Sequence, residues 1–204
     1  MTKKRNTAEL ILNIAQKKFA RYGLQKTTID EIARDAHISK GLIYHYYRSK
    51  EDMYIAVIER EASSCEASLV EKLSRYRSPR RKLETFVEIK REILEQNFNL
   101  ADMTEVTLHM VSDKQRARLL TLMEWELGLI VNILHEGMRA GYFRKMDCRT
   151  TAQILLVATD PVQWTRRGMH FGNGTLLNPA TMIKSSLNVL LDGLMSPKIK
   201  SKSV

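Results

Sequence analysis

Residues 27–52 read TTIDEIARDAHISKGLIYHYYRSKED, and the helix-capping residues of this stretch decide the fold. Thr28, followed three residues later by Glu31, fits a capping box, in which each side chain accepts the other residue's backbone N–H. Ser39 is a suitable N-cap for a second helix, because its hydroxyl can accept an unpaired N–H of the next turn. Ser49 marks the start of a third. The stretch therefore predicts two short helices, a tight turn between them and a longer helix, which is the outline of a helix-turn-helix DNA reader.

The spacing of apolar residues says which faces of these helices are buried. In the first helix the apolar positions fall at offsets of 0, 3, 4 and 7, which places them on one face. In the second, about residues 40–47, Ile43 and Tyr47 point inward together with Ile38 from the turn. The remaining side chains of the second helix then face outward, and they are Lys40, Gly41, Leu42, Tyr44, His45 and Tyr46.

On these residues the stretch resembles the DNA-binding domain of the tetracycline-repressor-like (TetR) family. The family pattern is a Thr-rich helix start, Ile-Ala-x-x-Ala, a Val-Ser turn, Gly-x-x-Tyr-x-x-Phe and Lys-Glu. The matching residues here are Thr27-Thr28, Ile32-Ala33 with Ala36, Ile38-Ser39, Gly41 with Tyr44 and Tyr47, and Lys50-Glu51. Two positions depart from it: His37 stands where the family usually has Gly, and Tyr46-Tyr47 replaces a His-Phe pair. His tolerates positive φ better than most residues, so the turn can still form.

The resemblance implies a role for each outward residue, with the second helix lying in the major groove. Thr28, Tyr44 and Lys50 would hold phosphates, and the chemistry of the other positions suits base edges. A Lys40 ammonium can donate to guanine, and a Leu42 side chain can contact a thymine methyl. His45 could instead be a solvated residue, and Tyr46 could equally pack inward. The expected DNA-binding set is Thr27, Thr28, Ser39, Lys40, Gly41, Leu42, Tyr44, His45, Tyr46 and Lys50.

The charge distribution supports the same location for a polyanionic partner. The chain has 33 Lys and Arg residues against 23 Asp and Glu, a formal net charge of +10. Residues 1–50 hold 11 basic and 4 acidic side chains, a net +7, so the other 154 residues carry only +3. Such asymmetry is typical of a protein whose N-terminal region neutralises phosphates.

Outside this stretch the sequence predicts only helices. A first helix over about 7–22, closed by Gly23, completes a three-helix unit. Further helices are expected over about 50–75, 78–98, 101–111, 114–140 and 148–167, the last bending at Pro161, and a final helix opens at Asn178-Pro179. Gly168, Gly172 and Gly174 mark a loop. The expected fold is all-α, with a helix-turn-helix DNA-binding domain at residues 1–50 and a larger helical bundle domain at 51–204 for effector binding and dimerisation.

The last helix carries an apolar stripe that needs a covering surface: Ile183, Leu187, Leu190, Leu191 and Leu194. In the family, the final pair of long helices forms a four-helix bundle with a second subunit, so the resemblance implies a homodimer that binds a palindromic DNA operator. A two-fold dimer places two recognition helices about 34–36 Å apart, which matches a palindrome. The alternative is that the stripe packs on its own domain.

The resemblance also implies that the larger domain binds a small-molecule effector. Met adapts to irregular apolar ligands and Trp stacks on flat ones. The expected lining residues are Met103, Glu105, His109, Met110, Met123, Trp125 and Trp164. For any single one of them, a plain core role is the alternative. The ligand class stays open among a drug-like cation, a fatty acyl compound and an aromatic metabolite.

Other classes of protein find little support. The chain has no P-loop, no Gly-x-Gly-x-x-Gly, no nucleophile elbow and no His-Glu-x-x-His, so we expect no enzyme. Cys65 and Cys148 are isolated, and the five His residues make no metal-ligand spacing with each other or with Cys. We therefore expect reduced thiols in a cytoplasmic protein, no metal and no cofactor. No apolar run is long enough to span a bilayer.

These expectations combine into a ligand-responsive transcriptional repressor that binds a palindromic operator as a homodimer and is released by an effector. Two alternatives remain at this stage. One is a non-enzymatic ligand-binding module whose DNA unit is vestigial. The other is a nucleic-acid binder without effector control, either an RNA-binding protein or an architectural DNA-binding protein.

Overall fold

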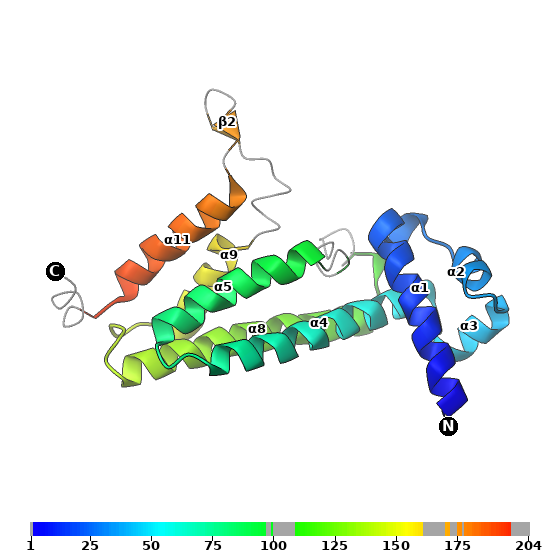
Figure 1. The fold of residues 1–204 in the computed structure, drawn as a ribbon, viewed down its shortest axis with the longest axis horizontal. Helices are drawn as coiled ribbons and strands as arrows, with labels where there is room; N and C mark the ends of the chain where they lie inside the picture. The colour runs from blue at the N-terminus through cyan, green and yellow to red at the C-terminus, as the bar shows by residue number, and fades with distance from the viewer. Residues whose placement is uncertain are drawn as a thin grey trace. The chain divides into compact units, whose positions relative to one another are not determined.

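The structure is a computed structural model that describes residues 2–96, 99, 109–160, 170–171, 175–176 and 178–196. Its helices are α1 (Thr2–Lys26), α2 (Ile29–Asp35), α3 (Lys40–Tyr46), α4 (Lys50–Ser74), α5 (Pro79–Gln96), α8 (Asp113–Arg139), α9 (Cys148–Ala158) and α11 (Pro179–Leu194) (Figure 1). The predicted all-α fold is confirmed. Pro161 and the three loop glycines lie outside the described residues, and of the helix expected over 101–111 only residues 109–111 are described.

A short strand pair was not predicted. β1 (His170–Phe171) pairs antiparallel with β2 (Thr175–Leu176), in the register His170 to Leu176 and Phe171 to Thr175. Strands of two residues are too short to display an alternating pattern, so they could not be predicted from the sequence.

Side-chain caps fix where the helices begin. Thr28 makes both halves of the capping box with Glu31, and Ser39 accepts from the Leu42 N–H at 3.2 Å. Asp147 accepts from the first amides of α9, and Asn178 does the same for α11, whose first residue is Pro179. Because each cap uses residues close together in the chain, these starts were predictable from the sequence.

The chain divides into two compact units, to which α4 and α8 both contribute. Unit 1 comprises residues 1–66 and 95–122, and unit 2 comprises 67–94 and 123–204. Among the described residues, no helix is both long and apolar enough to cross a membrane.

The core of unit 1 joins α1, α2 and α3 to the first half of α4. Phe19 of α1 meets Tyr54 of α4 edge to face, with ring centroids 5.2 Å apart. Ile43 is the buried residue of α3 and has no exposed surface. A polar seam reinforces the contact between α1 and α4, because Arg60 donates to Asn13 at 2.7 Å and the Gln16 amide donates to the buried carboxylate of Glu61 at 2.7 Å. Helices α1, α2 and α3 thus pack against the first half of α4.

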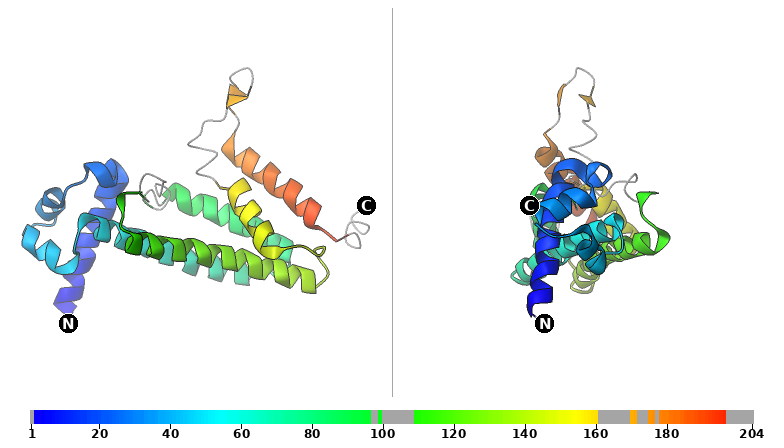
Figure 2. Two further views of the ribbon diagram at one scale, coloured as in Figure 1. Left: turned by 180° about the vertical axis from the view of Figure 1, so that it is seen from behind. Right: turned by 90° about the vertical axis from the view of Figure 1, so that its right-hand side faces the viewer.

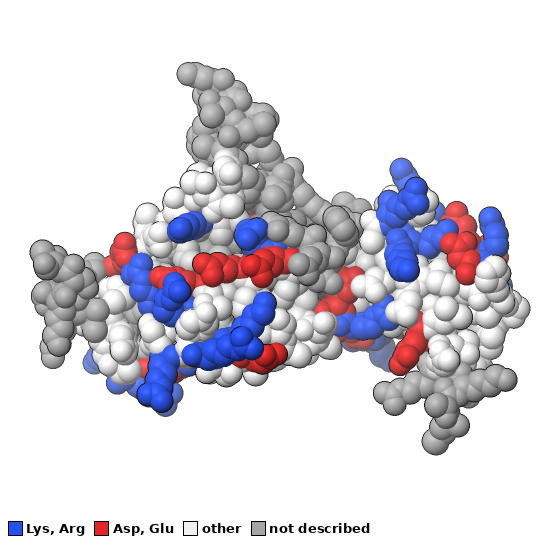
Figure 3. Space-filling model, viewed as in Figure 1, with Lys and Arg blue, Asp and Glu red and all other residues white. Residues whose placement is uncertain are grey.

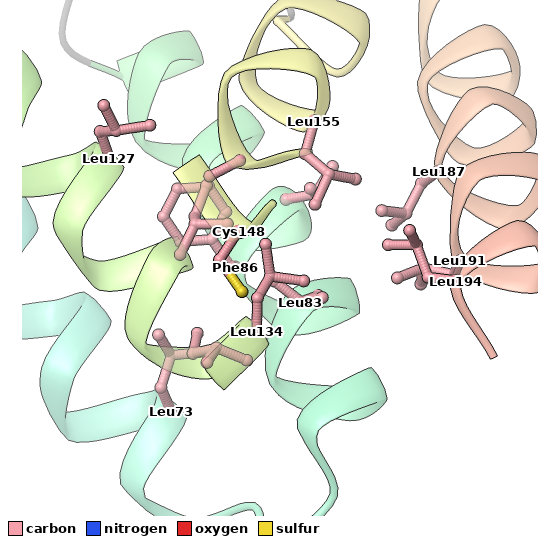
Figure 4. Close-up of a cluster of buried hydrophobic side chains, with 14 of the residues drawn as sticks. Leu73, Leu83, Phe86, Leu127, Leu134, Cys148, Leu155, Leu187, Leu191 and Leu194 are labelled. Carbon is pink, nitrogen blue, oxygen red and sulfur yellow. The ribbon is translucent and has the colours of Figure 1, made fainter. Parts of the chain in front are cut away.

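The core of unit 2 is built mainly from leucines and isoleucines of α5, α8, α9 and α11. Figure 4 shows Leu83 and Phe86 of α5, Leu134 of α8 and Leu155 of α9 gathered in one cluster. Ion pairs flank it, with Lys82 at 2.7 Å from Glu136 and Lys90 at 2.8 Å from Glu126. These pairs hold α5 against α8.

A close approach at Gly137 shapes the end of α8. A Cβ built there would lie 2.2 Å from the Phe143 ring, so only glycine allows that ring to fold back onto the helix. Phe143 in turn forms an antiparallel bridge with Met195, and the Arg144 N–H donates to the Leu194 carbonyl at 2.9 Å. The turn between α8 and α9 is therefore tied to the last residues of α11.

The stripe of α11 lies inside its own chain, which corrects the expectation that it supplies the dimer surface. Ile183, Leu187, Leu191 and Leu194 are buried in the core of unit 2, and Leu190 is partly buried against it. Figure 4 shows Leu187, Leu191 and Leu194 on the side of α11 that faces the other helices. The alternative of packing on the same domain therefore holds for these residues, because α9 and α11 of one chain already cover each other (Figure 2).

Candidate nucleic-acid interface

Helix α3 has only seven residues and presents most of them to solvent. Ser39 caps it, and Ile43 fastens it to the core. Leu42 and Tyr44 are 37% and 47% exposed. Nothing but the Ser39 hydroxyl, at 4.0 Å, comes near the place of a Cβ on Gly41. The helix therefore offers an open backbone flanked by Leu42 and Tyr44.

Lys40, His45 and Tyr46 complete the outward face of α3. The Lys40 ammonium lies 2.8 Å from the Asp30 carboxylate on α2, and this hydrogen bond raises the pKa of Lys40. His45 is exposed and meets the Tyr46 ring edge to face at 5.4 Å. Tyr46 is half-buried against the core of unit 1. Tyr46 therefore combines packing with partial exposure, the two roles that the sequence left open.

The two predicted phosphate anchors outside α3 lie at helix starts. Thr28 is exposed, and its hydroxyl and N–H both donate to the Glu31 carboxylate at 2.9 Å. These bonds lower the pKa of Glu31. The Lys50 ammonium donates to the Gln25 carbonyl at 3.3 Å, beside the first turn of α4. Helix N-termini with a neighbouring cation suit a phosphate.

Thr27 is a correction to the expected DNA-binding set. Its side chain is fully buried, and its hydroxyl donates to the Gly23 carbonyl at 2.8 Å. Gly23 itself has φ 74° and ψ 169°, which breaks α1 near its end. Thr27 therefore secures the turn from α1 to α2, and its buried hydroxyl has no access to a phosphate in this conformation.

The turn between α2 and α3 holds His37 at φ 53°, as the departure from the family's glycine required. The His37 N–H donates to the Arg34 carbonyl at 3.1 Å and the Ile38 N–H to the Ala33 carbonyl at 3.0 Å, so the turn closes normally. Left-handed backbone costs free energy in a residue with a Cβ. The turn between α2 and α3 therefore forms even though His37 bears this cost.

A basic concavity lies beside this turn. It has a volume of about 600 Å³ and is lined by Ile14, Lys17, Lys18, Arg21, Tyr22, Arg34, Asp35 and His37. Lys18 pairs with Asp35 at 2.8 Å, so one of its cations is already neutralised. Figure 3 shows Lys and Arg side chains gathered over α1 and α2, with a few acidic ones among them. The excess of positive charge predicted for residues 1–50 thus has an exposed location.

The described members of the predicted effector set are divided between the two units. Met110 packs on the core of unit 1, whereas Trp125 packs on the core of unit 2. Met123 is 49% exposed and His109 is exposed. Met103, Glu105 and Trp164 lie outside the described residues.

Unit 2 has a surface groove between α5 and α11, which the sequence did not predict. Its volume is about 370 Å³, and its buried floor is Val87, Ile183 and Leu187. Arg81 and Lys184 stand among its charged lining residues. The groove joins segments about 100 residues apart, so periodicity within either helix could not reveal it.

Comparisons with known proteins agree with a DNA-binding helix-turn-helix at this end of the chain. A model of the tetR family of bacterial regulatory proteins matches residues 11–57, and a model of the C-terminal region of YsiA-like proteins matches residues 64–181, more than half of the chain. The fatty acid metabolism regulator protein of Bacillus subtilis is 24% identical over 161 residues, which cover 78% of this chain and 83% of that protein. The transcriptional repressor KstR2 of Rhodococcus jostii is 29% identical over 190 residues, or 92% and 90% of the two chains.

Solved structures show the same fold. The crystal structure of the transcriptional regulator FadR from Bacillus subtilis in complex with stearoyl-CoA superposes with a TM-score of 0.75 at 22% identity, covering 91% of this chain and 98% of that one. The ketosteroid transcriptional regulator KstR2 of Mycobacterium tuberculosis superposes with a TM-score of 0.65 at 21% identity, covering 93% and 95%. With the helix-turn-helix geometry described above and both family models matched in order, the chain belongs to the TetR family of bacterial transcriptional regulators.

Proposed function

We propose that this regulator is a homodimeric repressor that occupies a palindromic operator and leaves it when a fatty acyl-CoA thioester binds. In this proposal residues 1–50 read DNA, residues 51–204 bind the effector and dimerise, and no step involves catalysis. The protein would act in the cytoplasm, where a bacterial operator is found.

The observation that carries the proposal is the exposed face of α3. A solvated helix normally turns charged and polar side chains outward, whereas α3 exposes Leu42 and Tyr44 beside an unobstructed Gly41. Apolar contact with a thymine methyl and a tyrosine hydroxyl on a phosphate would account for both exposures. Lys40 would exchange its Asp30 partner for a guanine edge.

The proposed dimer surface lies on the other sides of α9 and α11. Ile154 and Val157 of α9 are 50% and 63% exposed, and Val189 of α11 is 73% exposed. Since the two helices are in contact, a second copy of the pair could cover these side chains in a symmetric arrangement. The small residues Ser185 and Gly193 flank Val189 at intervals of four, which would let helices approach closely.

The relatives support an acyl-CoA as effector. One relative regulates fatty acid metabolism by its name, and the solved FadR structure is a complex with stearoyl-CoA. Effector control needs a difference in affinity between the DNA-competent and released states, because only that difference can shift the equilibrium. An acyl-CoA that bound both states equally would leave operator occupancy unchanged.

A mobility-shift titration against the DNA upstream of the protein's own gene tests operator binding. We expect sequence-specific retardation that is lost in the Tyr44→Phe, Lys50→Ala double variant, with the helical content unchanged by circular dichroism. Lys50→Ala alone should lower the slope of log affinity against log salt by about one, since one phosphate contact is lost. Arg75→Ala removes a charge from an exposed pair at the end of α4 and serves as the control that should leave the slope unchanged.

Equal retardation of random DNA by the wild type would refute the repressor and favour an architectural binder. A slope that stays the same in Lys50→Ala would remove that lysine from the interface.

Sedimentation analysis tests the dimer. Val189→Asp should convert a dimer to a monomer, because it places a charge in an apolar contact. Val70→Asp makes the same change at another exposed valine, on α4, and should leave the dimer intact. A Val189→Asp protein that stays dimeric at micromolar concentration would place the interface elsewhere.

Effector binding is tested by thermal shift with stearoyl-CoA, free CoA and stearate. A ligand that binds only the folded state raises the melting temperature, by an amount that grows with its concentration over Kd. We expect stearoyl-CoA to raise the melting temperature and to release the operator in the mobility-shift assay. Operator release by none of the three, with sequence-specific binding intact, would retain the repressor and reject this effector class.

A further inference from the structure

Three sulfur and nitrogen side chains meet where α9 begins. The Cys148 thiol is buried, with its Sγ 3.7 Å from Nδ1 of His135 and 4.0 Å from Sδ of Met138. His135 and Met138 are three residues apart on α8, so they lie on neighbouring positions of one helix face. All three belong to unit 2. None of the three is among the residues proposed above for the DNA or dimer surfaces.

The separations match those expected around a three-coordinate metal ion. Bonds of about 2.0–2.3 Å to nitrogen and sulfur ligands, arranged in a triangle, place the ligand atoms about 3.5–4.0 Å apart. Both measured separations from the Cys148 Sγ fall in that interval. A metal bound to Cys148 could therefore reach either His135 or Met138 with little change in these two separations.

The types of ligand select the class of metal. Thiolate and thioether sulfurs prefer soft cations such as Cu(I), and imidazole also binds copper. Zn²⁺ sites use four ligands, usually Cys, His or carboxylate. Among the described residues, no three His, Cys, Asp or Glu side chains are grouped so as to hold a metal ion, which disfavours zinc.

We propose that Cys148, His135 and Met138 bind one Cu(I) ion. The metal would take the place of the thiol proton, which passes to solvent, and would join the Cys148 sulfur to the imidazole nitrogen and the thioether sulfur. His135 is exposed and provides the way in from solvent, while the two sulfurs lie on the protected side.

A redox-sensing thiol would be the other use of a cysteine beside a histidine. Redox-sensing thiols are normally accessible to solvent, whereas Cys148 is 4% exposed. The cluster could not be predicted from the sequence, because Cys148 follows His135 by 13 positions and the usual metal-binding motifs contain no methionine.

The test is an anaerobic titration of the reduced full-length protein with Cu(I), in competition with bathocuproine disulfonate. We expect the wild type to withdraw one Cu(I) per chain from the chelator. Met138→Leu keeps the core volume and His135→Gln changes an exposed residue, so both should fold, and each should weaken Cu(I) binding at least about tenfold. X-ray absorption of the loaded protein should show sulfur and nitrogen neighbours together.

Cys65 supplies the matched control, because it is the other buried free cysteine. Cys65→Ser should bind Cu(I) as tightly as the wild type, and Cys148→Ser, once shown to be folded by circular dichroism, should not bind it. Wild-type affinity in both Met138→Leu and His135→Gln would mean that a single thiol binds copper adventitiously, and the proposal would be wrong. A wild type that withdraws no copper would overturn it too.

Discussion

Helices α3 and α11 begin alike and are used in opposite ways. Each starts at a side-chain cap, Ser39 or Asn178, that accepts backbone N–H groups of the first turn. Yet α3 buries one residue and exposes Leu42 and Tyr44, whereas α11 buries a continuous stripe against its own chain. A helix that contributes so little to the core while exposing apolar side chains is available to an outside partner. Leucine is therefore exposed toward a partner in α3 and buried in the core in α11.

The largest expected effect contrasts one leucine from each helix. Leu191→Ala removes a fully buried side chain of α11, and we expect it to lower the free energy of unfolding by about 2–5 kcal/mol because it leaves a cavity. Leu42→Ala on α3 should change stability by less than about 0.5 kcal/mol, as for most exposed positions. Urea denaturation followed by circular dichroism measures both. Similar losses in the two variants would contradict the assigned division between partner-facing and core leucines.

A second contrast lies within α8, at two glycines. Gly137→Ala should destabilise unit 2 by about 1–3 kcal/mol, because the new methyl group would overlap the Phe143 ring. Gly128→Ala meets no atom within 4 Å and should stabilise the helix by about 0.5–1 kcal/mol. Thermal unfolding would register the two changes with opposite signs. A neutral Gly137→Ala would show that Phe143 does not fold back as described.

A smaller effect is expected at the turn before α3. His37→Gly should raise stability by up to about 1 kcal/mol, since glycine adopts the φ of 53° without the steric cost borne by a residue with a Cβ. Denaturant unfolding would detect it. A loss of stability would mean that the His37 side chain makes contacts that outweigh the backbone strain.

The smallest effect concerns the cap of α2 and appears as a pH dependence. The N–H and hydroxyl of Thr28 hydrogen-bond to Glu31 and lower its pKa below the ordinary value of 4.5. A lowered pKa in the folded state means that the contribution to stability is present above pH 4.5 and is lost as the pH falls through the folded value. Glu31→Gln should therefore flatten the stability profile in that acidic window. An identical profile for wild type and variant would show that the capping box adds no charge-dependent stability.

Local features of the chain were predictable, and long-range ones were not. The caps at Thr28, Ser39, Asp147 and Asn178 involve neighbours in sequence, so the starts of α2, α3, α9 and α11 followed from the residues alone. The exposed face of α3 followed from helical periodicity. The surface that covers an apolar stripe could not be predicted in this way. Periodicity shows that α11 has a buried face, but it does not show which helices pack against that face.

The misassigned and missed residues share this cause. Thr27 adjoins the capping box in sequence, but its hydroxyl turns back to α1, which depends on the break at Gly23. The groove between α5 and α11 and the cluster around Cys148 each bring together segments that no local pattern connects. Departures of this kind from local expectation are the places where tertiary structure adds functional information.

The pairing of Lys40 with Asp30 has a consequence for how the protein would discriminate between sequences. In the absence of DNA the ammonium already has an anionic partner at 2.8 Å, so the proposed docking on a base would be an exchange of partners and not the gain of a new one. A guanine edge with two acceptors would replace the carboxylate as the partner of the lysine, whereas a base that offers a donor would not. The intramolecular pair would thus act as an internal competitor, which weakens binding to every sequence and penalises the wrong ones most.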